Sequence, residues 1–421
     1  MRGERGVSRN AKIELVSMIV LLGFFIAVVF HYILGFYYQV SYPLNTFLIN
    51  PKPAISFSDF PPPYFSADAL APYHVTYNNN RASVYFPFTY LIYYLLTKIG
   101  GFIALFVFLW SYLCVLFILN KNYFYTALPR DDLTHKIAAI KNVFILTFLT
   151  YPVLFCFERA NAEVFIFIFL ALALYFYHAH AFKKSVIFFA LAIAMKGFPA
   201  VFLVLFLADK RYKEAFLLIF LVLLFTFSSL ALFRGDSIFI QISHLATNLL
   251  WFKHHFILSN LSEMYNTSFY GAFNIVNHLI KNIPWEKQPW SINQLYVYMG
   301  IAVFLFLIMS AYVIGIEKTF WKKIAILTAC MLLLPPISYD YRLLNIYLPL
   351  YCFVNSDTKK SDWFYAVIFG ALLIPKNYYL IYGQVSISNL LNTGLLLSLV
   401  IGIFYQGIVS MTLNRRACIS I

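Results

Sequence analysis

The feature that most constrains this chain is a series of long apolar runs separated by short basic segments. After a basic start, residues 13–38 form a run long enough to cross a bilayer, and further runs follow along the chain. Hydrophobic residues make up 62% of the 421 residues and charged residues only 11%, against about 25% in soluble domains. The pattern predicts an all-α polytopic membrane protein with about 10–13 transmembrane or re-entrant helices. The later apolar runs are residues 101–119, 142–157, 162–177, 185–208, 216–233, 292–315, 324–337, 343–354, 364–375 and 388–410.

The excess of positive charge, +14 at pH 7, falls in clusters between these runs. Lys and Arg gather in the cytoplasmic loops of membrane proteins, so the clusters indicate one face of the membrane rather than a nucleic-acid surface. No small-residue cleavage signal follows the first run, and we expect an uncleaved first helix with its N-terminus in the cytoplasm. The basic clusters are residues 120–141, 178–184, 209–215, 317–323, 355–363 and 414–416.

One charged residue, Lys196, interrupts the apolar run 187–207. A lysine at the centre of a bilayer costs roughly 2.5–3.5 kcal/mol, so such residues are usually functional or paired. Basic clusters flank this run on both sides, and a single crossing cannot have both ends in the cytoplasm. We therefore expect two short helices that meet at MKGFP (195–199), with Lys196 at the apex of a polar cavity open to the outer face. The alternative is one kinked helix whose lysine is paired with a nearby carboxylate.

This topology makes residues 1–421 a single domain with two outer segments, the first loop at 39–100 and a large loop at 234–291. Residues 84–97 are expected to form a short juxtamembrane or re-entrant helix. A cavity ringed by two or three cations and one or two carboxylates would suit an anionic substrate, because cations neutralise a phosphate and a carboxylate can act as general base. The ionisable candidates on this face are Asp59, Asp68, His74, Arg81, Glu158, Arg159, Glu163, Lys196, Asp340 and Arg342.

Several classes of site are left open or excluded. Arg159 with Glu163, and Asp340 with Arg342, could instead be structural ion pairs. The chain has no Walker loop, no dinucleotide fingerprint and no nucleophile elbow, and it has no long soluble segment for a nucleotide-binding fold. An activated substrate therefore has to arrive through the membrane, which indicates a lipid-carried donor. No metal site, no cofactor and no nucleic-acid partner are expected.

Four stretches resemble the GT-C integral-membrane glycosyltransferases, and within them glycosyltransferase family 87, the polyprenol-phosphate-mannose-dependent mannosyltransferase-like proteins. The first is DFPPPYFSADALAPY (59–73), with YFPF (85–88) standing where Tyr-Pro-Pro is usual. The second is YPVLFCFERANAEVFIFIFLALAL (151–174), and the third is FALAIAMKGFPAVFLVLFL (189–207). The fourth combines NTSFYGAF (266–273) with LPPISYDYRLLNIYLPL (334–350). In order and spacing the resemblance covers roughly residues 50–350.

The chain departs from the family pattern at four positions. Ala160 stands where glycine is usual, and Phe86 replaces the first proline of the Tyr-Pro-Pro stretch. Tyr339 replaces a tryptophan, and Tyr341 stands where a histidine is expected. The change at Tyr341 bears on any histidine-assisted step and on the choice of sugar or acceptor.

The resemblance implies an inverting transfer of a hexose, mannose or glucose, from a polyprenyl-phosphate sugar to a glycolipid or lipid-linked polysaccharide. It places this reaction at the outer face of a bacterial cytoplasmic (inner) membrane, whose lipids are further partners. Carried over by position, Asp59 would be the catalytic base, and Arg159 and Lys196 would hold the donor phosphate. The other substrate-binding residues that it implies are Asn161, Asn266, Ser268, Tyr339, Asp340, Tyr341 and Arg342.

Two rival classes remain. A polysaccharide polymerase or ligase would share the lipid-phosphate substrate, but such proteins usually have one dominant outer loop late in the chain. A polyprenyl-lipid transporter should show internal repeats with paired broken helices, and we find none at comparable spacing. We therefore rank the transferase first, the polymerase or ligase second and the transporter third.

Overall fold

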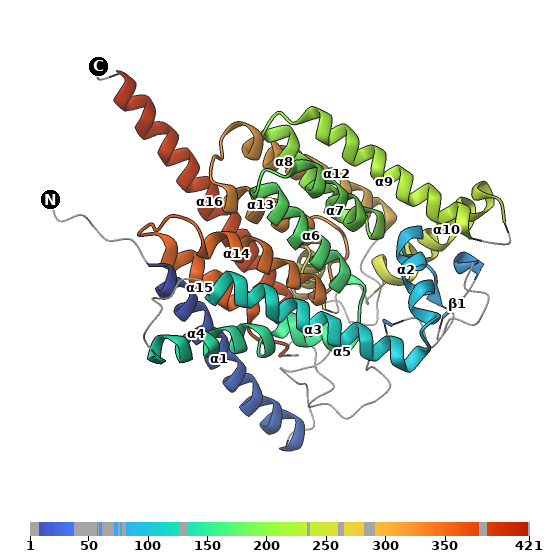
Figure 1. Cartoon of the computed structure of the whole chain (residues 1–421), viewed down its shortest axis with the longest axis horizontal. Helices are drawn as coiled ribbons and strands as arrows, with labels where there is room; N and C mark the ends of the chain where they lie inside the picture. The colour runs from blue at the N-terminus through green and yellow to red at the C-terminus, as the bar shows by residue number, and fades with distance from the viewer. Residues whose placement is uncertain are drawn as a thin grey trace.

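The structure is a computed structural model that describes residues 8–37, 57, 59–60, 71–74, 76–77, 81–125, 133–233, 236–259, 265–281, 291–378 and 385–419. Helices dominate this part of the chain (Figure 1). The one sheet within the described residues is a pair of two-residue antiparallel strands, β1 (Thr76–Tyr77) and β2 (Arg81–Ala82). The all-α fold class predicted from the sequence is confirmed.

Among the described residues, five helices are long and apolar enough to cross a membrane. A sixth candidate is the pair α4 and α5, which is bent by 45°. The chain is therefore an integral, multi-pass membrane protein, as predicted. The five helices are α1 (Arg9–Tyr32), α3 (Gly101–Tyr125), α9 (Tyr212–Leu232), α12 (Ile292–Gly315) and the first part, Ser388–Thr412, of α16 (Ser388–Ile419).

The remaining helices are shorter, and several match predicted apolar runs. The expected helix at 84–97 is present as α2. The shorter helices are α2 (Pro87–Thr97), α4 (Leu133–Phe148), α5 (Tyr151–Arg159), α6 (Glu163–His178), α7 (Phe182–Met195), α8 (Leu203–Ala208), α10 (Ile238–Phe252), α11 (Phe269–Lys281), α13 (Phe320–Leu333), α14 (Tyr347–Val354) and α15 (Asp362–Leu373). The 3-10 helices are η2 (Pro72–His74), η4 (Phe198–Phe202) and η7 (Asp340–Ile346), and the π-helices are η1 (Ile33–Tyr37) and η5 (Lys253–Ile257).

Two boundaries differ from the prediction. The run 142–157 is not one continuous helix, because Pro152 lies in the first turn of α5. Proline is tolerated there, since the N–H groups of the first turn have no partner within the helix, but inside a longer helix it would break the hydrogen-bond pattern. The segment 120–141, expected as a loop, is partly helical, since α3 extends to Tyr125 and α4 already begins at Leu133.

Short helices rather than spans form the centre of the bundle. Every residue of α13 from Ile324 to Leu333 is buried, which is typical of a helix that is apolar on all sides. Helix α1 approaches α15 closely at Gly370, where an added Cβ would lie 2.9 Å from the Cβ of Ile19. Small residues at such crossings let helix backbones pack tightly in membrane proteins.

The segment around Lys196 is a helical hairpin, as preferred from the sequence. Helix α7 ends at Met195, and η4 with α8 runs back along it, so that Phe189 stacks on Phe202 at 5.6 Å between ring centroids. At the open end of the hairpin, the guanidinium of Arg211 lies 4.2 Å from the ring centroid of Phe182. The single kinked helix is therefore wrong, although the lysine–carboxylate pair proposed with it does exist.

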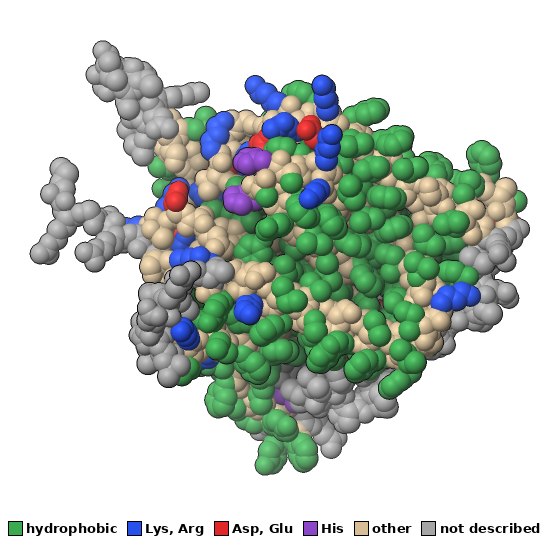
Figure 2. Space-filling view, viewed as in Figure 1, with side chains coloured by type: hydrophobic (Ala, Val, Ile, Leu, Met, Phe, Trp, Pro, Cys, Tyr) green, Lys and Arg blue, Asp and Glu red, His purple; other side chains and the backbone are tan. Residues whose placement is uncertain are grey.

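Three of the predicted basic clusters meet at one end of the bundle. Lys323 forms a 3.0 Å ion pair with Asp209, and the ring of His178 stacks on Phe320 at 5.3 Å. Figure 2 shows Lys, Arg and His side chains gathered over the connections α6–α7 and α8–α9, next to a broad apolar surface. We call this region, residues 178–184, 209–215 and 317–323, the basic end. Helix α6, of 16 residues, leads about 24 Å from it to Glu163.

Candidate functional site

The turn between α5 and α6 presents several polar side chains at the end of α6 that is far from the basic end. Arg159 closes α5, and Ala160 adopts a left-handed conformation with φ of 49°. The Asn161 side chain then accepts a hydrogen bond from the backbone N–H of Glu163 at 3.0 Å, which starts α6. Glycine, which the family resemblance leads us to expect at position 160, would adopt this conformation without strain.

Asp59 lies directly against this turn. Backbone hydrogen bonds from Phe57 to the carbonyl of Glu158 (2.6 Å) and from Asp59 to that of Arg159 (3.1 Å) hold its segment along the end of α5. Arg159 donates to both oxygens of the Asp59 carboxylate, from Nε at 3.1 Å and from Nη2 at 2.7 Å. Nδ2 of Asn161 donates a third hydrogen bond to it at 2.9 Å. Asp68, another candidate from the sequence, and the prolines at 61–63 lie outside the described residues.

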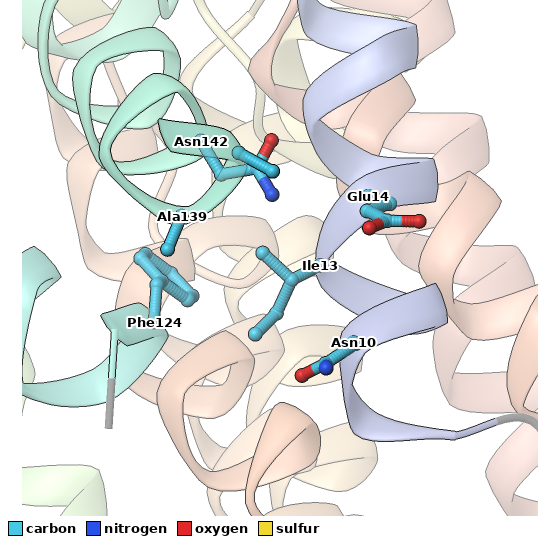
Figure 3. A pocket seen from close by; sticks show the side chains of 7 residues that line it. Asn10, Ile13, Glu14, Phe124, Ala139 and Asn142 are labelled. Carbon is cyan, nitrogen blue, oxygen red and sulfur yellow. The ribbon is translucent and has the colours of Figure 1, made fainter. Parts of the chain in front are cut away.

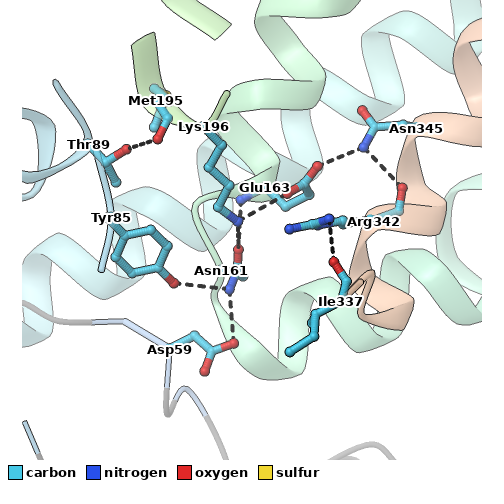
Figure 4. A network of polar contacts seen from close by, with 10 residues as sticks. All are labelled: Asp59, Tyr85, Thr89, Asn161, Glu163, Met195, Lys196, Ile337, Arg342 and Asn345. Carbon is cyan, nitrogen blue, oxygen red and sulfur yellow. Dashed lines mark hydrogen bonds and ion pairs between the residues drawn. The ribbon is translucent and has the colours of Figure 1, made fainter. Parts of the chain in front are cut away.

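Lys196 points from the hairpin apex to the same turn. Its Nζ donates to Oδ1 of Asn161 and to Oε2 of Glu163, both at 3.1 Å (Figure 4). The ammonium also lies 5.4 Å and 5.2 Å from the ring centroids of Tyr85 and Tyr341, within cation–π range. Asn161 thus joins the two halves, since its amide group donates to Asp59 while its carbonyl oxygen accepts from Lys196. We call Asp59, Arg159, Asn161, Glu163 and Lys196 the charged cluster.

Arg342 adds a third cation beside the charged cluster. Its guanidinium lies 4.2 Å from the ring centroid of Phe198, and Nη1 donates to the carbonyl of Ile337 at 2.8 Å. Within the described residues, no Asp or Glu oxygen lies within ion-pair distance of this guanidinium. Arg159 and Lys196, in contrast, each have a carboxylate partner.

The tyrosines around the charged cluster are donors rather than bases. Burial, together with the nearby Asp59 carboxylate, raises the pKa of Tyr85 well above its ordinary value. Burial also raises the pKa of Tyr341, and the neighbouring Tyr85 and Asp59 act in the same direction. Both hydroxyls therefore stay protonated at neutral pH.

A second set of polar residues joins the loop before α11 to the loop before η7 through hydrogen bonds. Oδ1 of Asn266 accepts from the Ser338 N–H at 2.8 Å, and the hydroxyl of Ser268 donates to the carbonyl of Pro336 at 3.1 Å. Thr267 donates to Asp340 at 2.9 Å. Burial raises the pKa of the Asp340 carboxyl to about 7, against the opposing effects of the Thr267 hydrogen bond and the Lys376 ammonium. We call this group the loop clasp; its residues, all fully buried, are Asn266, Thr267, Ser268, Ser338 and Asp340.

The two ion pairs considered from the sequence are wrong. Arg159 pairs with Asp59 rather than with Glu163, because the turn at Ala160 separates the end of α5 from the start of α6. Asp340 and Arg342 are two positions apart in η7, and side chains with this spacing do not face each other on a helix.

The predicted site residues therefore fall into two groups. Asp59, Arg159, Asn161 and Lys196 come together, and Arg342 and Tyr341 border them. The others, Asn266, Ser268 and Asp340, are in the loop clasp, and Tyr339 lies between the groups, with its backbone bridged to Asn266 and its ring 5.8 Å from that of Tyr341.

Sequence reasoning gave no role to Tyr85, Phe198 or Asn345, and it considered Glu163 only as an ionisable candidate or as an ion-pair partner of Arg159. Asn345 donates to Oε1 of Glu163 at 2.7 Å and thereby reaches the charged cluster from η7. An isolated amide within the apolar stretch RLLNIYLPL was a signal that could have identified Asn345. Tyr85 opens the stretch YFPF, whose resemblance to a Tyr-Pro-Pro motif was the signal that could have identified it.

Other parts of the described structure offer less charge. A groove of about 510 Å³ between α15 and α16 has no charged side chain among the described residues that line it. A cavity of about 20 Å³ between α1, α3 and α4, bordered by Asn10, Glu14 and Asn142 (Figure 3), has room for a water molecule but not for a sugar. Among the described residues, no group of three His, Cys, Asp or Glu side chains could hold a metal ion. In the charged cluster, by contrast, two cations and two carboxylates meet beside the rings of Tyr85 and Tyr341.

Comparison with known proteins supports the resemblance seen in the sequence. The profile of glycosyltransferase family 87 matches residues 84–336, which is more than half of the 421-residue chain. No curated protein and no solved structure showed significant similarity. Arg159, Asn161, Glu163 and Lys196 lie inside the matched region, whereas Asp59 and Arg342 lie outside it and reach the charged cluster through the fold.

Proposed function

The chain belongs to glycosyltransferase family 87, and from this premise we propose that the charged cluster is its active site. The proposed reaction transfers a hexose, mannose or glucose, from a polyprenyl-phosphate sugar to a glycolipid or lipid-linked polysaccharide. One observation carries the proposal. Two cations, Lys196 and Arg342, flank the ring of Phe198, and the Asp59 carboxylate is held beside them through Asn161.

The donor phosphate would bind to Lys196 and Arg342. Both cations approach the ring of Phe198, at 5.9 Å for the ammonium and 4.2 Å for the guanidinium, and they are close enough to repel each other electrostatically, so one phosphate would contact both. Arg342 has no carboxylate partner among the described residues, and a guanidinium matches phosphate geometry well. Arg159, for which the resemblance implied a phosphate contact, is engaged with Asp59 and would mainly orient that carboxylate.

Asp59 would act as the base. It accepts three hydrogen bonds, two from Arg159 and one from Asn161. A carboxylate offers about four lone-pair sites, so one site remains on Oδ1 for the acceptor hydroxyl. As the acceptor oxygen bonds to the anomeric carbon, its proton passes to Asp59. The bond from that carbon to the phosphate oxygen breaks, and its electron pair leaves with the polyprenyl phosphate.

The cations would then stabilise the transition state. Negative charge grows on the phosphate oxygen as the bond to the sugar breaks, and fixed cations there lower the barrier more than they favour the ground state. Attack opposite the leaving phosphate inverts the anomeric configuration. The chain's own residues thus supply a base, an orienting group and a phosphate site.

The same geometry supports an outer-face site. If the basic end faces the cytoplasm, α6 and α7 carry the charged cluster about 20 Å toward the other side of the membrane. We further propose that the chain is a single domain with outer segments at 39–100 and 234–291. Cysteines introduced at Lys184 and Arg211 should both resist an impermeant thiol reagent added from outside. Labelling of either one would contradict this orientation.

The activity can be tested directly with purified protein and a panel of polyprenyl-phosphate hexoses. We expect release of polyprenyl phosphate from at least one donor, together with an acceptor product of inverted configuration. Release of polyprenyl diphosphate from a diphosphate-linked glycan would instead support a polymerase or ligase. Movement of intact lipid across vesicles without any turnover would support a transporter.

A further inference from the structure

Glu163 connects the two cations that are proposed to bind phosphate. Its Oε2 accepts from the Lys196 ammonium at 3.1 Å, and its Oε1 accepts from Nδ2 of Asn345 at 2.7 Å. The same amide group donates to the backbone carbonyl of Arg342 at 3.0 Å. A chain of contacts therefore runs from Lys196 through Glu163 and Asn345 to the segment that carries Arg342 (Figure 4).

These contacts join elements that are far apart in the sequence. Glu163 is the first residue of α6, Lys196 is at the hairpin apex, and Asn345 belongs to η7. Apart from Glu163, the Lys196 ammonium has one hydrogen-bond partner within the described residues, Asn161, and it lies in cation–π range of three aromatic rings. Without Glu163, the distance between Lys196 and the Arg342 segment would depend on packing and on the cation–π contact with Tyr341.

We propose that Glu163 and Asn345 are positioning residues, which fix Lys196 and the Arg342 segment at the spacing that holds the donor phosphate. This inference rests on the proposed function. Glu163 acts through Lys196 and not on the substrate, because its side chain is completely buried while that of Lys196 remains 11% exposed. Its second oxygen is held by Asn345, so the carboxylate cannot follow a lysine that moves.

The same chain contains a matched control for the possibility that the Lys196–Glu163 pair only stabilises the fold. Lys12 and Asp362 form another buried lysine–carboxylate pair, at 2.7 Å, with side chains 0% and 3% exposed. Lys12 also donates to the carbonyl of Phe353, so this pair too ties two segments together. Asp362→Asn therefore removes a buried carboxylate of the same kind, away from the charged cluster.

The experiment measures donor KM, acceptor KM and kcat for Glu163→Gln and Asp362→Asn, and the affinity of each for polyprenyl phosphate. Hydrogen bonds to charged groups contribute enough that we expect Glu163→Gln to raise the donor KM and the polyprenyl-phosphate Kd roughly 10-fold. Acceptor KM should change less than about 2-fold, and Asp362→Asn should lower thermal stability with donor KM unchanged. Glu163→Asp, which keeps the charge, should restore part of the donor affinity.

Asn345→Ala tests the positioning role independently if Glu163→Gln does not fold. It should raise the donor KM roughly 3-fold, since one hydrogen bond to the carboxylate is lost. An unchanged or lower donor KM in these variants would overturn the inference. An unchanged value would mean that Glu163 does not affect donor binding, and a lower value would mean that it competes with the phosphate for Lys196. If Lys196→Met also leaves donor KM unchanged, the proposed phosphate site itself fails; an effect of Lys196→Met alone overturns only the positioning role.

Discussion

The charged cluster and the loop clasp both consist of polar residues that the sequence assigns to one face of the membrane. They differ in the solvent exposure of these side chains and in their hydrogen-bond partners. In the charged cluster the side chains of Arg159, Asp59 and Lys196 remain 22%, 14% and 11% exposed, and they bond to side chains within the cluster, including the buried Asn161 and Glu163. In the clasp the side chains are fully buried, and several of them bond to backbone groups. Groups that must exchange a partner for a substrate need the first arrangement, whereas the second holds loops in place.

The largest expected difference concerns the two aspartates. Asp59→Asn keeps the shape of the side chain but removes the base, so turnover should fall by about 10²–10⁴-fold while polyprenyl-phosphate binding persists. The readout is kcat with saturating donor and acceptor. If turnover stays near normal in Asp59→Asn and is lost in Asp340→Asn or Glu158→Gln instead, the base has been assigned to the wrong region.

A smaller effect is expected at the cations. Lys196→Met fills the same space without the charge, and the donor kcat/KM should fall roughly 10–100-fold, as for the loss of hydrogen bonds to a charged group. Arg342→Gln should behave alike, because both cations are proposed to contact one phosphate. Full activity in Lys196→Met would show that its pairing with Glu163 serves the fold alone.

At the loop clasp we expect an effect of pH on the stability of the fold rather than an effect on substrate binding. Burial raises the pKa of Asp340 to about 7, so the folded state binds a proton that the unfolded chain has already lost above about pH 4. This contribution to stability is full below pH 4 and is lost as pH rises toward 7. Asp340→Asn should remove that slope, so its melting temperature should fall further below wild type at pH 5 than at pH 7.5. Equal differences at the two pH values would contradict the buried, protonated carboxyl.

The smallest effect is expected at Ala160, where the family resemblance leads us to expect glycine. Glycine would relieve the left-handed backbone, about 1–2 kcal/mol, but would lose a buried methyl group, about 0.8 kcal/mol. The free energy of unfolding should therefore change by no more than about 1 kcal/mol in Ala160→Gly. Ala160→Val should be clearly less stable in the same thermal scan, because a β-branched residue tolerates this conformation poorly.

The sequence predicted the features that depend on composition and local pattern. A charge in an apolar run identified Lys196, and basic clusters on both sides of that run predicted the hairpin. It could not predict partners across long separations, such as Asp59 with Arg159, 100 residues apart. Pairs guessed from neighbouring positions were wrong, because a left-handed turn and a two-residue spacing decide which side chains face each other.

The sequence also could not distinguish the residues of the charged cluster from those of the loop clasp. Asn266, Ser268 and Asp340 have the same residue types as a sugar-binding site, and only their burial and backbone partners place them in the clasp. Asn345 lies in an apolar stretch, and its link to Glu163 depends on the packing of η7 against α6. Burial and hydrogen-bond partners are properties of the folded chain, not of residue type.

The most direct test of the central claim is an experimental structure of the protein with polyprenyl phosphate bound. We expect the phosphate to lie between the Lys196 ammonium and the Arg342 guanidinium, with the Asp59 carboxylate open on the side where the sugar would sit. A phosphate found at the loop clasp, or at the basic end, would contradict the assignment of the charged cluster as the active site.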